Sequence, residues 1–115
     1  MYEIVILNGQ DYPVRFGMNS LRVFCHATGR SLQDLEKIGF DLSLNDACEL
    51  IKAGLSDGAR KAGKDFQMTT EDIADLLDED FEALQRVLDV FATQFTAKAG
   101  STGNEKGGKK TPKKK

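Results

Sequence analysis

The sequence YEIVILNGQDYPVRF at residues 2–16 decides the fold class. Two runs of β-branched, aliphatic and aromatic residues flank Asn8-Gly9, a pair that accepts the positive φ angles required at both centres of a type I′ turn. The pattern predicts a β-hairpin with a two-residue turn and three cross-strand pairs: Leu7–Gln10, Val5–Tyr12 and Glu3–Val14.

Because side chains alternate along a strand, the hairpin has two faces. One face should pack on helices, since a two-stranded hairpin is marginally stable alone. Its members are Val5, Leu7, Tyr12, Val14 and Phe16. The other face carries Ile4, Ile6, Asp11, Pro13 and Arg15. Pro13 has no N–H to donate, so we expect its strand to be a sheet edge at that point. Ile4 and Ile6 are either simply half-exposed or serve self-association or partner binding.

From residue 19 onward the pattern is helical. Three helix starts have a hydroxyl followed three residues later by an acid: Ser31 and Asp34, Ser43 and Asp46, Thr69 and Asp72. Each hydroxyl can accept from a free backbone N–H, and each acid can reach back to the cap N–H. Together with the helix-ending glycines 29 and 39, these signals predict helices over residues 19–28, 31–38, 43 to about 58, 70–77 and 80–95.

Apolar residues at helical spacing give these helices an inward-facing stripe. The stripes are Leu21, Phe24, Cys25 and Thr28; Leu32, Leu35 and Ile38; Leu44, Ala47, Cys48, Ile51 and Leu55; and Phe81, Leu84, Leu88, Phe91 and Phe95. Gly54 and Gly58 each disfavour a helix by about 1 kcal/mol relative to Ala, so we expect the third helix to fray near Gly58. The predicted fold is α+β and mostly helical, with an N-terminal β-hairpin packed on a bundle of four to five helices.

The charge is divided unevenly along the chain. The net charge of the 115 residues is −2, but residues 97–115 hold seven Lys and one acid, which gives +6 and leaves −8 for residues 1–96. The 97–115 segment has no large apolar residue, so we expect a disordered basic tail behind a single globular domain at 1–96. The tail could bind nucleic acid loosely, act as a solvating appendage, or fold over an acidic helix face in cis or between copies. An acidic body makes nucleic acid an unlikely partner for the domain itself.

Several kinds of chemistry find no support in the sequence. No stretch approaches the roughly 18–20 apolar residues of a membrane span, and we expect no secretion signal. The single His, His26, follows Cys25 directly. Because neighbouring side chains on a helix point about 100° apart, the two do not form a nucleophile–base pair. Cys–x–x–Cys, His–x–x–x–His and calcium-loop spacings are absent, so we expect no metal and no cofactor. The acidic run at 71–82 is either helix capping with a solvated face or a surface for a basic partner or the tail.

Three short motifs resemble a known family. They are the hairpin closed by Asn8-Gly9 and followed by RFGMNSL at 15–21, the turn Ala53-Gly54-Leu55, and TEDIADLLD at 70–78. Over about residues 3–92 this order resembles the tail assembly chaperones of long-tailed bacteriophages. The last nineteen residues match no pattern of that family.

The resemblance implies a non-enzymatic role in the host cell cytoplasm. Such chaperones coat the tape measure protein, keep it soluble, help tail tube subunits polymerise around it, and are absent from the mature virion. In many of them a programmed ribosomal frameshift adds a second domain to a minority of chains. This longer form would contact the tail tube protein. The lysines at 109–110 and 113–115 are compatible with slippery codons.

A chaperone of this kind needs an apolar surface for its partner. We expect a groove between the hairpin and the last helix that takes an amphipathic helix. Its candidate residues are Ile4, Ile6, Phe81, Leu84, Leu88 and Phe91. Two other functions stay open at this point: a minor structural tail component, and a small adaptor that binds nucleic acid through the basic tail.

Overall fold

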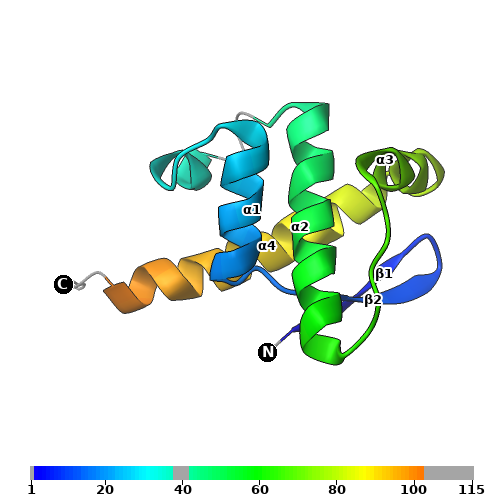
Figure 1. The fold of residues 1–115 in the computed structure, drawn as a ribbon, viewed down its shortest axis with the longest axis horizontal. Helices are drawn as coiled ribbons and strands as arrows, with labels where there is room; N and C mark the ends of the chain where they lie inside the picture. Colours follow the sequence, from blue (N-terminus) through cyan, green and yellow to red (C-terminus); the bar gives the residue numbers. More distant parts are fainter. Residues whose placement is uncertain (1, 38–41, 103–115) are drawn as a thin grey trace.

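The computed structural model describes residues 2–37 and 42–102. The elements in chain order are β1 (Glu3–Leu7), β2 (Gln10–Val14), α1 (Met18–Thr28), the 3₁₀ helix η1 (Gln33–Lys37), α2 (Leu44–Ala62), α3 (Thr70–Glu79) and α4 (Glu82–Thr102). Helix α2 is central, because it contacts α1, β2, α3 and α4. In Figure 1, α1 and α2 stand side by side, α4 crosses behind them, and the hairpin lies beside the C-terminal half of α2. The predicted α+β, mostly helical fold is confirmed.

The hairpin forms in the predicted register. Antiparallel β1 and β2 pair Glu3 with Val14, Val5 with Tyr12 and Leu7 with Gln10. Both turn residues have positive φ, 50° at Asn8 and 80° at Gly9. The pair next to a two-residue turn is hydrogen-bonded and the pattern alternates along the ladder, so Pro13 occupies a position whose N–H would point away from β1. The missing donor therefore costs the ladder nothing.

The core collects side chains from every element. Its largest fully buried members are Phe16, Phe24, Leu7, Leu35, Leu50, Ile51, Leu55, Ile73, Val14 and Val87. Helix caps form where the sequence predicts them. Thr69 and Asp72 make a reciprocal capping box, and the Ser43 hydroxyl accepts from the Asp46 N–H at 3.1 Å.

Helix α2 does not fray near Gly58, contrary to the prediction. It continues to Ala62 and ends at Gly63, whose φ is +73°. Gly58 and Gly54 sit where the helix meets the strand and its following loop, and the Arg15 N–H donates to the Gly54 carbonyl at 3.0 Å. A side chain at either glycine would overlap Pro13 or Phe16. Close packing of the sheet thus outweighs the poor helix propensity of glycine.

Two predicted inward positions near η1 are wrong. The predicted helix at 31–38 is the short η1, and Leu32 lies before its first residue and is exposed. Leu44 is the first residue of α2 and is also exposed, and the buried residues of that helix begin at Ala47. Leu35 is buried as predicted, whereas Ile38 lies outside the described residues.

Helix α4 also differs from the prediction. Phe81 precedes the helix and is 69% exposed, so it does not begin the buried stripe. The predicted stripe is confirmed at Phe91, which is buried together with Ala83 and Val87 in an i, i+4, i+8 row. The other predicted members, Leu84, Leu88 and Phe95, are partly buried against the core. The helix continues past Phe95 to Thr102, into the segment predicted as tail. Residues 103–115, which include six of the seven tail lysines, lie outside the described residues.

Candidate partner-binding surface

The six candidate residues fall into three different environments. Ile4 and Ile6 lie on the outer face of the hairpin and are each 55% exposed. Phe81 is exposed at the junction of α3 and α4. Leu84 and Leu88 are half-buried against the core, and Phe91 is buried in it, edge-to-face with Phe16 at a centroid distance of 5.3 Å. The structure leaves Ile4 and Ile6 as the adjacent exposed pair, which we call the outer hairpin face.

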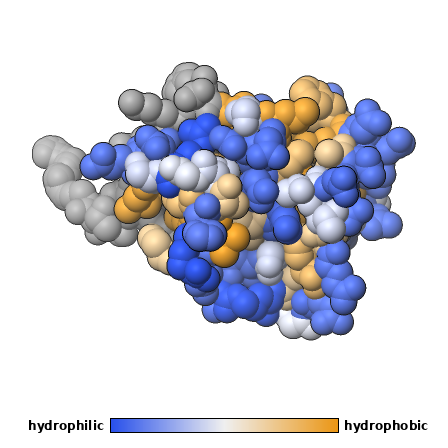
Figure 2. All heavy atoms as spheres, turned by 45° about the horizontal axis from the view of Figure 1, so that its top comes forward, coloured by the Kyte–Doolittle hydropathy of each residue, from blue (hydrophilic) through white to orange (hydrophobic). Residues whose placement is uncertain are grey.

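The predicted groove between hairpin and last helix is a small, mixed depression. It has a volume of about 200 Å³ and is lined by Glu3, Asp89, Val90, Thr93 and Gln94. None of the six candidates lines it. Figure 2 shows, on the side of the molecule drawn there, hydrophobic surface broken into separate areas by hydrophilic side chains. A partner helix therefore has no preformed apolar groove at this position.

The tip of the hairpin is fixed to the α3–α4 junction. The Asn8 N–H donates to Asp80 Oδ2 at 2.8 Å. The Arg86 guanidinium donates to the same carboxylate oxygen at 2.8 Å and to the Ile6 carbonyl at 3.0 Å. The hydrogen bond from Arg86, followed by the one from Asn8, lowers the pKa of Asp80 below its ordinary value. These contacts hold β1 and the turn in one orientation.

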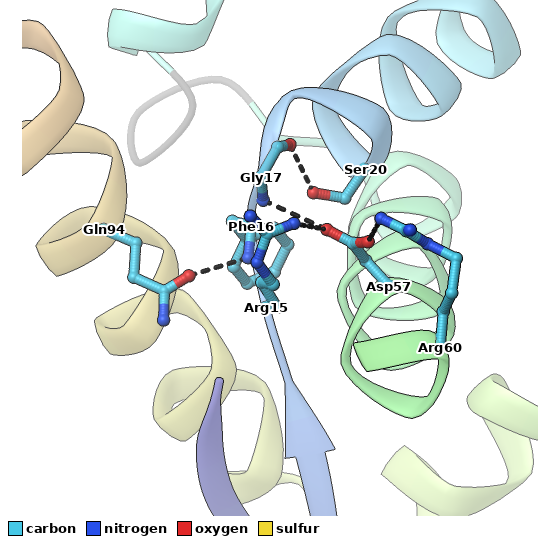
Figure 3. Close-up of polar contacts among 7 residues, drawn as sticks. All are labelled: Arg15, Phe16, Gly17, Ser20, Asp57, Arg60 and Gln94. Carbon is cyan, nitrogen blue, oxygen red and sulfur yellow. Dashed lines mark hydrogen bonds and ion pairs between the residues drawn. The ribbon is translucent and has the colours of Figure 1, made fainter. Parts of the chain in front are cut away.

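The base of the hairpin is fixed by a buried carboxylate. Asp57 of α2 accepts from Arg15 at 2.9 Å, from Arg60 at 2.6 Å and from the Gly17 N–H at 3.3 Å (Figure 3). Gly17 is the N-cap of α1 and has no side chain, so Asp57 of another helix accepts from the N-cap N–H and places a negative charge at the start of α1. Burial alone would raise the pKa of Asp57, but the hydrogen bonds from Arg60 and Arg15 outweigh it, and the pKa is lowered.

A third contact joins the hairpin to α4. The Gln94 side chain points at the segment after β2, and its Oε1 accepts from the Phe16 N–H at 2.7 Å (Figure 3). The outer hairpin face is thus an exposed aliphatic strip on a frame that is held at its tip, at its base and along α4. Because this frame already orders the strand, binding of a partner at Ile4 and Ile6 loses little additional conformational entropy.

Within residues 2–37 and 42–102, no three His, Cys, Asp or Glu side chains are grouped so that they could hold a metal ion. No helix of that part of the chain is long and apolar enough to cross a membrane. Burial, with a smaller effect of Asp34 or Glu49, raises the pKa of the Cys25 and Cys48 thiols, which keeps them protonated near neutral pH.

Sequence reasoning missed the residues that fix the hairpin. Asp57, Gln94 and Arg86 meet partners that lie at least 40 positions away in the chain, and no local pattern marks such contacts. Asp80 stands in the acidic run, but nothing distinguishes it there from its neighbours. Comparison of the chain with protein-family models, curated proteins and solved structures gives no match.

Proposed function

We propose that this protein is a tail assembly chaperone of a long-tailed bacteriophage. It binds the tape measure protein in the host cell cytoplasm, keeps it soluble and promotes tail tube assembly. The observation that carries the proposal is the outer hairpin face, on which Ile4 and Ile6 stay exposed while the hairpin is fixed at both ends. The resemblance of the hairpin, the 15–21 stretch and the 70–78 stretch to that family supports the same role.

The physical argument concerns the partner before assembly. Before the tail tube assembles around it, the long helical tape measure protein exposes apolar surface and aggregates unless that surface is covered. A small acidic domain with one aliphatic strip can cover part of it and keep the complex soluble through its net charge. A frameshift-extended form of the chaperone would bind the tail tube protein. The proposal also includes self-association of the chaperone.

Co-expression tests the proposal directly. The full chain is expressed with the tape measure protein of the same phage, and soluble tape measure protein is measured and checked for co-purification. We expect the wild type to keep it soluble, the double variant Ile4→Ser/Ile6→Ser to fail, and Val23→Ser, an exposed apolar position on α1, to behave as wild type. Equal solubility with and without the protein contradicts the proposal, as does its presence in purified virions.

A further inference from the structure

We propose that the segment which binds the outer hairpin face is an amphipathic helix with an aliphatic stripe flanked by Lys or Arg. This inference rests on the proposed function and specifies the chemistry of the partner.

The free edge of β1 is poorly suited to an added strand. Ile4 and Ile6 occupy the non-hydrogen-bonded positions of the ladder, so their main-chain groups point away from β2. The Ile6 carbonyl already accepts from Arg86, and α4 packs alongside β1. An added strand would have to displace Arg86, which also holds the hairpin tip. A helix that lies across the exposed side chains removes no hydrogen bond, so helix packing is the favoured mode.

Two exposed carboxylates lie close to this strip. Asp11 is exposed and lies directly opposite Ile6 in the ladder. A second exposed acid, Glu82, lies near the same strand, because its Oε1 is 3.7 Å from Arg86 Nη2 and the Arg86 guanidinium donates to the Ile6 carbonyl. The nearby guanidinium of Arg86 is already paired with Asp80, and that of Arg15 with Asp57. A partner that buries the two isoleucines is therefore brought close to net negative charge, which favours basic residues beside its stripe.

Two other occupants fit less well. A second copy that packed on this face about a two-fold axis would place two identical acidic surfaces against each other, which is repulsive. The Lys-rich 97–115 segment would match the charge, but it has no large apolar residue to cover the isoleucines. A separate helix that combines aliphatic and basic residues satisfies both requirements.

Two designed helical peptides of about 20 residues test the inference. They share one Leu/Ile stripe; in the first the flanking positions are Lys, and in the second they are Glu. Binding of each dye-labelled peptide to the full-length protein is measured by fluorescence anisotropy. We expect the Lys-flanked peptide to bind at least about tenfold more tightly than the Glu-flanked one, and to weaken between about 50 and 500 mM NaCl.

Variants locate the site. The charge reversal Asp11→Lys/Glu82→Lys, at two exposed positions, should weaken the Lys-flanked peptide by about tenfold or more, and Ile4→Ser/Ile6→Ser should do the same. Val23→Ser is the matched control and should leave binding unchanged. Equal binding of the two peptides, or no effect of the charge reversal, overturns the inference, as does a dimer that Ile6→Ser dissociates.

The inference and the proposed function fail separately. Suppose that the wild type and Asp11→Lys/Glu82→Lys solubilise the tape measure protein equally well. The proposed function is then kept, and the inference that the partner helix has basic flanks is rejected. If the wild type never captures the tape measure protein, the proposed function fails whatever the peptides show.

Discussion

Gly58 lies where α2 touches the backbone of β2, and Gly58→Ala tests how the sheet is attached. In an open helix this change would stabilise the protein by about 1 kcal/mol. Here a Cβ would lie 2.6 Å from the Val14 nitrogen and still closer to the Pro13 carbonyl, whereas ordinary contacts begin at 3.4 Å. The strand would have to move by about 1 Å, and overpacking of this kind costs about 1–3 kcal/mol. Because the obstacle is backbone, we take the upper end and expect a net loss of about 2 kcal/mol.

Urea unfolding followed by far-UV circular dichroism measures the effect. The midpoint should fall with an unchanged slope, and the Tm should drop by about 10 °C. Ser56→Ala, at an exposed position of the same helix, is the control and should stay within about 0.5 kcal/mol of wild type. A Gly58→Ala protein that is as stable as wild type, or more stable, would show that α2 is not pressed against the strand and would refute the reasoning.

Three further changes have expected outcomes. Phe91→Ala should lower the free energy of unfolding by about 3–5 kcal/mol, because the ring is buried against Phe16 and Phe95. Phe81→Ala should lower it by less than about 0.5 kcal/mol, because that ring is exposed. Equal losses in urea unfolding would contradict the observed orientation of α4. Asp57→Asn should cost about 2–3 kcal/mol at pH 7. Because the folded pKa of Asp57 lies below its unfolded value, the stability that its carboxylate contributes is present above about pH 4 and is lost as the pH falls through the folded pKa. The variant should therefore lose less stability on acidification than the wild type. Parallel profiles of stability against pH would argue against this. Asp80→Ala should speed hydrogen exchange of the Asn8 amide, since that N–H loses its acceptor, while exchange in α2 stays unchanged; an unaltered Asn8 rate would mean that the tip is held by other contacts.

Local features of this fold are readable from the sequence. The Asn8-Gly9 turn sets the register of the hairpin, because only a two-residue turn brings the alternating apolar residues to one face. The Thr69 capping box and the αL glycine after α1 are also determined within a few residues of chain. For these features the interacting groups are close neighbours, so a pattern of letters is enough.

Features that depend on distant contacts are not readable in the same way. Gly58 predicts a weak helix end, and only the structure shows that β2 packs against it. The 3-4-3-4 spacing from Phe81 misses the buried Ala83 and Val87 and includes Phe81, which is exposed. For the candidate surface, the sequence marks Ile4 and Ile6 as a second hairpin face, and the structure shows them exposed. Phe91 could not be separated from them by spacing alone, because a core residue and a partner-binding residue share the same apolar chemistry.

Site-specific crosslinking inside the assembling complex tests the central claim most directly. A photo-crosslinking amino acid is placed at position 6 of the full chain, and at position 23 as a control, during co-expression with the tape measure protein. The outer hairpin face predicts a crosslinked product that contains tape measure protein from position 6 and none from position 23. A complex that co-purifies but crosslinks only from position 23 would contradict the claim that Ile4 and Ile6 meet the partner.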